Sequence, residues 1–458
     1  MGSEAILKAP YRAAMNGKWD GMIDYYQKHS EYLHSPLTAS KETALHIAVC
    51  SKQEQPLKDL LEIMTKSELP LTETEFLKKK NKFGNTVLHE ATIYGNNKAV
   101  KLLVERCPEL LSDPNEFGET PLFTAAGFAE TEIVEFLIRS KPEQCVDNNG
   151  RLLSIHIKRS VDGLSILSAA IIGQNFETAL LLLELVKSLA SLKDRNQIST
   201  LQLLAEMPAA FESEFPMGIF ERLIYCCLPV PRHRKVKSKE KSRSRAGKGV
   251  GDLESGLGRN SGDLGSVSKR NQRGGILKYL KVPKGCWLEG IWNQKKKHVF
   301  ALRFAESLVK KDDSYELEGE EGRDGKQTVL LSSQIITGDL NKEEEGQTSK
   351  ITSEAKEIKN VQCPSAQTSL IKSSLTIKVE SPLFTATRRG IEKIVEMITK
   401  LHPHAIEKLN KEGQSILDMA VMYRQTKIFD FLKQQKIPLT RMLRVVDSKG
   451  NTLLHHVA

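Results

Sequence analysis

The chain has 458 residues, of which 40% are hydrophobic and 27% charged, and its formal net charge is +10. This composition predicts a soluble protein of two or three domains. The most apolar run, residues 179–192, is broken by Glu184 and Lys187, which excludes a membrane-spanning helix.

The basic charge is concentrated in one segment. Residues 232–248 hold nine Lys or Arg against one Glu, which is +8 of the total +10 and leaves about +2 for the rest of the chain. The seven cysteines are odd in number, show no C-x-x-C spacing and follow no secretory leader. They predict a reducing, cytoplasmic compartment.

One short phrase recurs along the chain: a turn with Gly, then Thr or Ser, an apolar anchor and a small residue. Its clear copies are TALHIA at 43–48, GNTVLHEA at 84–91, GETPLFTA at 118–125 and GLSILSAA at 163–170. Weaker copies are STL at 199–201, SPLFTA at 381–386, GQSILDMA at 413–420 and GNTLLH at 450–455, and YRAAMNG at 11–17 resembles an N-terminal cap. The anchor residues are Leu45, His46, Leu88, His89, Leu122, Leu167, Leu201, Leu383, Leu417, Leu454 and His455.

The spacing of these anchors identifies the repeat. Leu88 and Leu122 lie 34 residues apart, as do Leu383 and Leu417, which is close to the ankyrin period. A second apolar helix pattern follows most copies. The sequence therefore predicts an all-α ankyrin-repeat solenoid of helix pairs with short turn fingers, arranged as two stacks joined by disordered linkers.

Five segments follow in chain order. Residues 1–228 are predicted to form a first stack of about six repeats including the cap, and 229–275 a basic disordered linker. Residues 276–311 are predicted to contain an amphipathic docking helix, with Trp292, Leu302 and Val309 on its apolar stripe, that packs on the end of one stack. Residues 312–377 are predicted to be a disordered linker, first acidic and then polar, and 378–458 a second stack of about three repeats.

The arrangement of these segments resembles that of plant ankyrin proteins of the PGG-domain family, of the accelerated-cell-death and salt-tolerance type. The resemblance is carried by YRAAMNGKW at 11–19, TALHIA at 43–48, KKHVFAL at 296–302, SPLF at 381–384 and GNTLLHH at 450–456. It implies an ankyrin region on the cytoplasmic face of the plasma membrane or endomembranes, in defence, cell-death or stress signalling. The family's C-terminal membrane segments and its Pro-Gly-Gly motif are missing here, so the last repeat, which stops after its first helix, predicts a truncated form.

The basic run is open to three interpretations: a solvated spacer, a contact with an anionic membrane surface, or a signal for nuclear import or nucleic-acid contact. Its basic residues are Arg232, Arg234, Lys235, Lys237, Lys239, Lys241, Arg243, Arg245 and Lys248. Just before it, Cys226 and Cys227 could be acylated, although Leu223 and Ile224 beside them favour burial inside a helix.

The expected function is a non-enzymatic protein-protein interaction scaffold. No His, Cys or acid stands where a nucleophile would have a base and the base an orienting partner, and the recurring histidines are expected to be structural rather than metal ligands. No cofactor, metal or small-molecule substrate is expected, and nucleic acid is not favoured as a partner. The alternative is a nuclear ankyrin co-regulator imported through residues 232–248.

Overall fold

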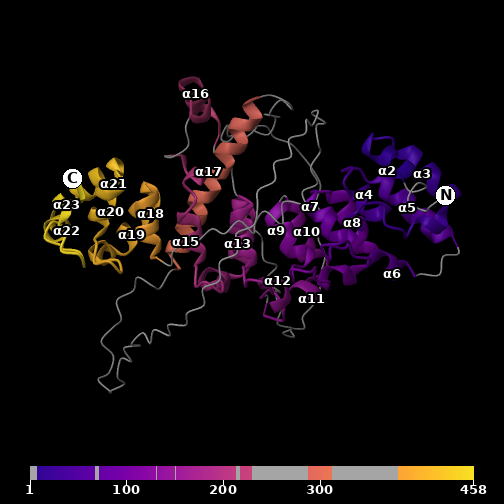
Figure 1. The fold of residues 1–458 in the computed structure, drawn as a ribbon, viewed down its shortest axis with the longest axis horizontal. Coiled ribbons are helices and arrows are strands. Elements are labelled where there is room, and N and C mark those ends of the chain that lie inside the picture. Colours follow the sequence, from indigo (N-terminus) through magenta and orange to yellow (C-terminus); the bar gives the residue numbers. More distant parts are fainter. Residues whose placement is uncertain are drawn as a thin grey trace, which may run out of the picture. The chain divides into compact units, whose positions relative to one another are not determined.

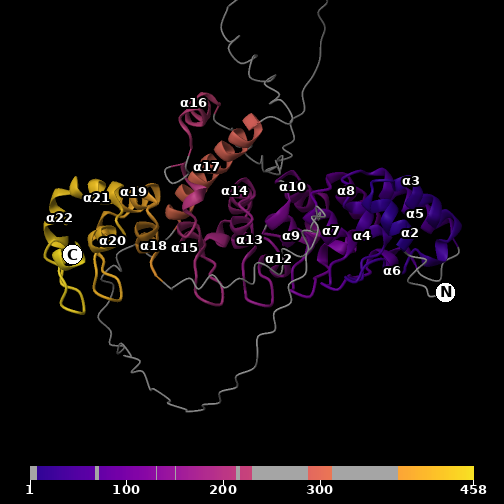
Figure 2. The same cartoon turned by 45° about the horizontal axis from the view of Figure 1, so that its top comes forward.

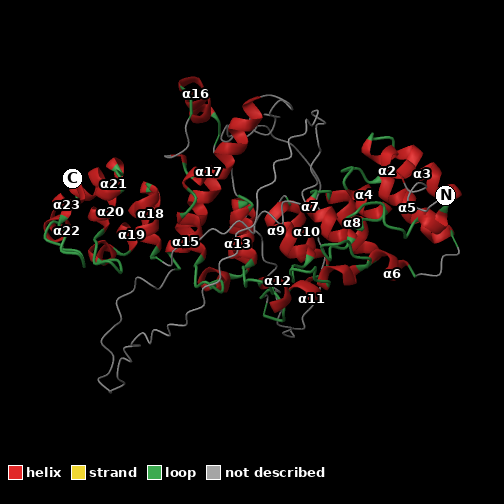
Figure 3. Cartoon of the chain, viewed as in Figure 1, coloured by secondary structure: helices red, strands yellow, loops and turns green. Residues whose placement is uncertain are grey.

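The computed structural model of the protein describes residues 8–67, 72–129, 131–149, 151–212, 217–229, 287–311 and 380–457. The basic run 232–248 and the predicted linker 312–377 lie outside these residues, as does 230–275 of the other predicted linker. Helices and turns make up the described residues, which contain no strand (Figure 3). Isolated bridges, such as Val146 to Leu152, close some of the turns.

The helices form pairs, and the first helix of each pair packs on the first helix of the next. These inner helices are α2 (Lys8–Met15), α4 (Ala44–Val49), α7 (Val87–Ile93), α9 (Pro121–Phe128), α13 (Ile166–Ile172), α15 (Thr200–Ala205), α18 (Pro382–Arg389), α20 (Ile416–Met422) and α23 (Leu453–Val457). The outer helices are α3 (Trp19–Lys28), α5 (Gln55–Lys66), α8 (Asn97–Arg106), α10 (Thr131–Ser140), α14 (Phe176–Leu185), α19 (Glu392–Leu401) and α21 (Thr426–Lys433). Figures 1 and 2 show the pairs following one another in chain order.

The recurring phrase explains where each inner helix begins. Thr120, Ser165 and Ser199 precede their helices in an extended conformation, and each side chain accepts a hydrogen bond from the backbone N–H three residues later. Such N-caps satisfy backbone donors that have no partner inside the helix. Pro121 follows its cap at the first helical position, where a missing N–H costs nothing.

The turn that precedes each inner helix is called a finger here, and a glycine in it allows neighbouring fingers to touch. Gly84 has a φ of +73°, and a Cβ at this position would lie 2.4 Å from the backbone nitrogen of Glu116 in the next finger. Any side chain at residue 84 would therefore suffer both backbone strain and a collision.

Short helices occupy the insertions between repeats. The longer spacing between Leu45 and Leu88 accommodates α6 (Glu73–Leu77), and that between Leu122 and Leu167 accommodates α11 (Pro142–Cys145) and α12 (Ser154–Ile157). Two further helices, α16 (Ile219–Cys227) and α22 (Lys436–Met442), lie outside the inner and outer series.

The inner helix α15 receives its outer partner from far along the chain. The helix α17 (Trp287–Val309) packs on α14, α15 and α19, which is the position of an outer helix between two neighbouring repeats. Phe300 and Phe304 of α17 and Phe176 of α14 are buried there. The predicted stripe differs from the observed buried side, because Leu302 is exposed and Trp292 is only half-buried, while Val309 is buried.

The segment 380–457 continues the first stack, whereas the sequence pattern predicted a separate second one. The helix α18 packs directly on α15, and α19 packs on α17, so the predicted docking helix lies within the series of repeats and not at its end. The described residues of 8–311 and those of 380–457 accordingly belong to one compact unit.

An ion-pair cluster joins the two segments at this contact. The buried carboxylate of Glu206, just after α15, accepts hydrogen bonds from Arg388 (2.5 Å) and Arg389 (2.6 Å) at the end of α18. Arg388 also lies 3.6 Å from Glu380. The sequence separation hid this connection, because the repeat pattern stops after residue 201 and resumes only at residue 381.

Candidate interaction surface

The structure places most of the repeat anchors in the interior. Leu45, Leu88, Leu122, Leu167, Leu201, Leu383 and Leu417 are buried, as are His46 and His89. Leu454 and His455 are exceptions, since both are exposed on α23 and Leu454 has 79% of its surface accessible. The helix α23 packs on α20, yet these two side chains remain accessible.

The histidines of the phrase connect each repeat to the next. The backbone N–H of Thr86 donates to Nδ1 of His89 (3.1 Å), so Nε2 carries the proton and donates to the carbonyl of Glu119 in the following finger (2.9 Å). His46 does the same with Thr43 and the carbonyl of Asn85. Burial lowers the pKa of His46 to about 4 and that of His89 to about 3, so both rings are neutral. With both ring nitrogens engaged, neither is free to bind a metal.

His156 supplies the imidazole that the third phrase lacks. Phe123 stands where His46 and His89 stand in the earlier copies, and the capping residue Thr120 contacts Nδ1 of His156 instead (2.8 Å). The other ring nitrogen of His156 contacts the carbonyl of Gln144 (2.8 Å). His156 lies on α12 inside an insertion, and its sequence position outside the repeat gave no signal of this role.

Hydrogen bonds connect a series of buried polar side chains at the base of the fingers, and this series is called the ladder here. Oε1 of Glu90 accepts from the amides of Asn81 and Asn85, both at 2.8 Å. The amide of Asn115 donates to Oδ1 of Asn85 (2.9 Å) and to Glu119 (3.1 Å).

The ladder ends on Arg159, whose guanidinium donates to Glu119 (2.9 Å) and to Asp162 (2.5 and 2.7 Å). Oε2 of Glu90 has no hydrogen-bond partner, but the hydrogen bonds of the other buried groups connect one finger to the next and favour one geometry, so three successive fingers are held in register.

Backbone hydrogen bonds join the fingers at their tips. The N–H of Lys82 donates to the carbonyl of Ser40 (2.7 Å), and that of Glu116 donates to Phe83 (3.1 Å). The side chains of Lys82, Glu116, Val161 and Arg195 are exposed on these tips. The edge therefore presents mixed charges and one apolar side chain on a rigid support.

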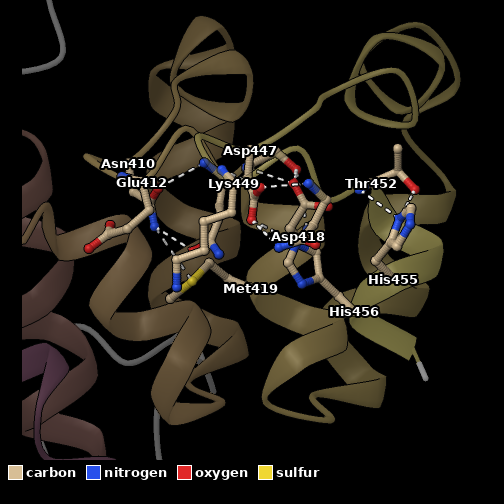
Figure 4. A network of polar contacts seen from close by, with 12 residues as sticks. Asn410, Glu412, Asp418, Met419, Asp447, Lys449, Thr452, His455 and His456 are labelled. Carbon is tan, nitrogen blue, oxygen red and sulfur yellow. Dashed lines mark hydrogen bonds and ion pairs between the residues drawn. The ribbon is translucent and has the colours of Figure 1, made fainter.

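The last fingers use the same chemistry with other residues (Figure 4). The Asp418 carboxylate accepts from the N–H and hydroxyl of Ser415, both at 2.8 Å, in place of a histidine. The N–H of Ser448 donates to the carbonyl of Glu412 (2.9 Å), and the Asp447 carboxylate lies 3.5 Å from Nε2 of His456. Thr452 contacts Nδ1 of His455 (2.9 Å).

The helix α16 presents a second exposed surface. Cys226 and Cys227 are exposed on it, as are Ile219, Phe220 and Leu223. The expectation that apolar neighbours bury the cysteine pair was wrong, because among these neighbours Tyr225 is the one that is buried, against α17. The basic residues that follow, 232–248, lie outside the described part of the chain.

The described part of the chain contains neither a metal-ion site nor a membrane-spanning helix. Within it, no three His, Cys, Asp or Glu side chains gather closely enough to hold a metal ion. None of the helices described there combines the length and the apolar character needed to cross a membrane.

The helix pairs, the capped turns and the histidines that join repeats define an all-α ankyrin-repeat solenoid. A sequence model of ankyrin repeats, covering three copies, matches residues 45–149. No curated protein matches the chain. Ankyrin repeats support a role in binding other proteins.

Proposed function

We propose that this chain is a non-enzymatic scaffold that binds a partner protein through its fingers and the exposed ends of its inner helices. One observation carries the proposal: the finger tips are exposed, yet the ladder from Glu90 to Arg159 holds them in one geometry. A preformed surface binds without first losing conformational entropy. In a stacked array, side chains at the tips are also free of the packing that fixes the inner and outer helices.

The experiment compares variants of the full chain by affinity purification from its native cells. The variant Lys82→Glu, Glu116→Lys, Val161→Asp should lose the partner that the unaltered chain retains, because it changes tip side chains alone. The control is Lys98→Glu, Glu105→Lys, which makes similar charge reversals on the exposed face of the outer helix α8. Equal recovery of the partner with both variants would contradict binding through the fingers.

We propose further that the scaffold works in plant defence, cell-death or stress signalling at a membrane. The support is the family resemblance, whose more particular phrases lie at 296–302 in α17 and at 450–456 around α23. The test is membrane fractionation of the tagged full chain from plant cells before and after a pathogen or salt challenge. A chain that stays in the unbound fraction throughout would contradict this setting.

The second candidate function is nuclear co-regulation, favoured by the charge of residues 232–248. Nuclear fractions are compared for the intact chain and for one lacking these residues. Nuclear accumulation that disappears on deletion would favour this function over the membrane setting.

A further inference from the structure

The exposed apolar residues and cysteines of α16 form one stripe, whereas Glu221 and Arg222 are exposed outside it. Ile219, Phe220, Leu223, Cys226 and Cys227 occupy positions i, i+1, i+4, i+7 and i+8, which fall on one side of an α-helix. Ile219 and Phe220 each have 80% of their surface accessible, and Leu223 has 60%. Clustered apolar exposure of this kind marks an interaction site more often than scattered single residues do.

The opposite side of α16 is fixed to α17. The hydroxyl of Tyr225 contacts Nδ1 of His298 (2.9 Å), and Gln294 contacts Nε2 of the same ring (2.7 Å). The buried ammonium of Lys295 donates to the carbonyls of Tyr225 and Leu228, both at 2.6 Å, and so caps the end of α16.

This attachment orients the stripe. Because Tyr225 faces α17, the stripe on the other side of the helix faces away from it. Figures 1 and 2 both show α16 beside α17 and apart from the inner helices. The contacts of Tyr225 and Leu228 with α17 thus hold the stripe outward, and the stripe residues themselves take no part in them.

The sequence next to α16 indicates what covers the stripe. Nine Lys or Arg residues begin at Arg232, five positions after Cys227, and the first acid after the helix is Glu240. A two-turn apolar stripe followed directly by such a positive charge is complementary to an anionic bilayer, in which apolar side chains enter the acyl boundary and cations meet the headgroups. An apolar groove on a protein would match the stripe but not this charge.

We propose that α16 docks on the surface of an anionic lipid bilayer and that Cys226 and Cys227 are sites of S-acylation. Shallow insertion of Phe220 and Leu223 places both thiols at the headgroup level. In the acylation step, a fatty acyl-coenzyme A is the donor. The thiolate sulfur attacks the acyl carbonyl, a new thioester forms, the bond from the acyl carbon to the coenzyme A sulfur breaks, and coenzyme A leaves as a thiol with the proton that the cysteine lost. A single weak membrane contact is reversible, whereas two signals together give stable anchoring.

The inference rests on the proposed membrane setting but not on the partner surface, which lies on the fingers. The first experiment is therefore co-sedimentation of the full chain, purified without acylation, with phosphatidylcholine vesicles that contain or lack phosphatidylserine. We expect binding to the anionic vesicles and a decrease of about tenfold or more for Phe220→Ser, Leu223→Ser. The control variant is Leu409→Ser, Leu443→Ser, which removes exposed apolar side chains elsewhere and should bind like the unaltered chain.

Three outcomes of this experiment overturn the docking site. They are equal binding to neutral and anionic vesicles, equal binding of the stripe and control variants, and absence of vesicle binding together with dimer formation that the stripe variant abolishes. The last would assign the stripe to a second copy of this chain.

The second experiment detects thioester-linked acyl groups on the chain expressed in cells, by hydroxylamine-dependent thiol labelling. Labelling should disappear in Cys226→Ser, Cys227→Ser and persist in Cys107→Ser, Cys145→Ser, whose cysteines are buried. Labelling that persists in the first variant, or is absent from the unaltered chain, overturns the acylation site. If a chain with all four stripe substitutions still fractionates with membranes, the membrane setting stands and this inference fails.

Discussion

At the scale of single residues, the anchor leucines and the anchor histidines stabilise the stack in different ways. Leu88 and Leu122 are fully buried between neighbouring inner helices, where they fill volume. His89 instead satisfies polar groups on both sides of a repeat boundary, since one ring nitrogen accepts from its own turn and the other donates to the next. The contribution of an anchor leucine to stability therefore depends on the volume that it fills, whereas that of a histidine depends on the hydrogen bonds that it makes.

Truncation of a buried anchor should destabilise the stack. We expect Leu88→Ala or Leu122→Ala to lower the free energy of unfolding by about 2 to 5 kcal/mol, because each leaves a cavity between repeats. Leu443→Ala, at a half-exposed site, should cost less than about 1 kcal/mol. The measurement is urea unfolding of the full chain followed by circular dichroism, and unchanged transitions in both anchor variants would remove these residues from the core.

Glu90 should make stability depend on pH. Burial, and secondarily the neighbouring Glu42, raise its pKa to about 7, although the amides of Asn85 and Asn81 favour the charged form. An acid whose pKa is raised on folding stabilises the fold fully below its unfolded pKa, and this contribution is lost as the pH rises through the folded pKa.

The variant Glu90→Gln should therefore gain stability relative to the unaltered chain as the pH rises from 5 to 8, by up to about 3 kcal/mol. The pKa values of His46 and His89 are lowered in both proteins alike. The stability that these histidines lose as the pH falls therefore cancels in the comparison. Urea unfolding at several pH values makes the measurement, and a constant difference between the two proteins would show that Glu90 is charged in the fold throughout.

At the scale of elements, the connection between α15 and α18 depends on a buried acid. Glu206→Gln leaves the guanidinium groups of Arg388 and Arg389 beside a neutral amide, and we expect a loss of about 1 to 3 kcal/mol. Glu407→Gln is the matched control. Its partner Arg441 is 2.7 Å away, against 2.5 and 2.6 Å for the arginines at Glu206, but the Glu407 pair is exposed and should contribute at most about 1 kcal/mol. Equal unfolding curves for the two variants would mean that the Glu206 cluster does not stabilise the junction.

The elements differ in how well the sequence predicts them. The inner helices α7, α9 and α13 could be predicted because cap, anchor and helical period agree within a few residues of one another. The position of α17 could not, since apolar periodicity predicts a helix but not which distant helices it meets. The role of His156 was hidden in the same way by its place in an insertion.

The exposed surface of α16 likewise could not be predicted from local sequence, because it depends on distant contacts. The exposure of Cys226 and Cys227 depends on Tyr225 being the residue of α16 that faces α17. Its hydroxyl contacts His298 and its backbone carbonyl accepts from Lys295, 73 and 70 residues further along the chain. Local apolar neighbours predict burial in general, but they do not say whether a helix is covered on one side or on both.

At the scale of the whole molecule, the stack should survive cuts in its connections. Site-specific protease sequences are inserted after Gly249 and after Glu345, both outside the described residues. After cleavage, the three fragments should co-elute in size-exclusion chromatography, because α17 packs on α14, α15 and α19 and α18 packs on α15. Chains with a single inserted sequence serve as controls, and release of the fragment that contains α17 under native conditions would refute one continuous stack.

The distant origin of α17 also sets an order of events during protein synthesis. The loop between α13 and α14 holds three residues, whereas about 80 separate α15 from α17, and closing the longer loop in an unfolded chain costs about 3 kcal/mol more. A ribosome that adds 5 to 20 residues per second needs roughly 5 to 20 seconds to pass from the end of α15 to the end of α17. The repeats before α15 can fold as they emerge, while the apolar sides of α14 and α15 stay open during this interval. A nascent chain stalled near residue 250 should therefore be the species that chaperones bind most strongly.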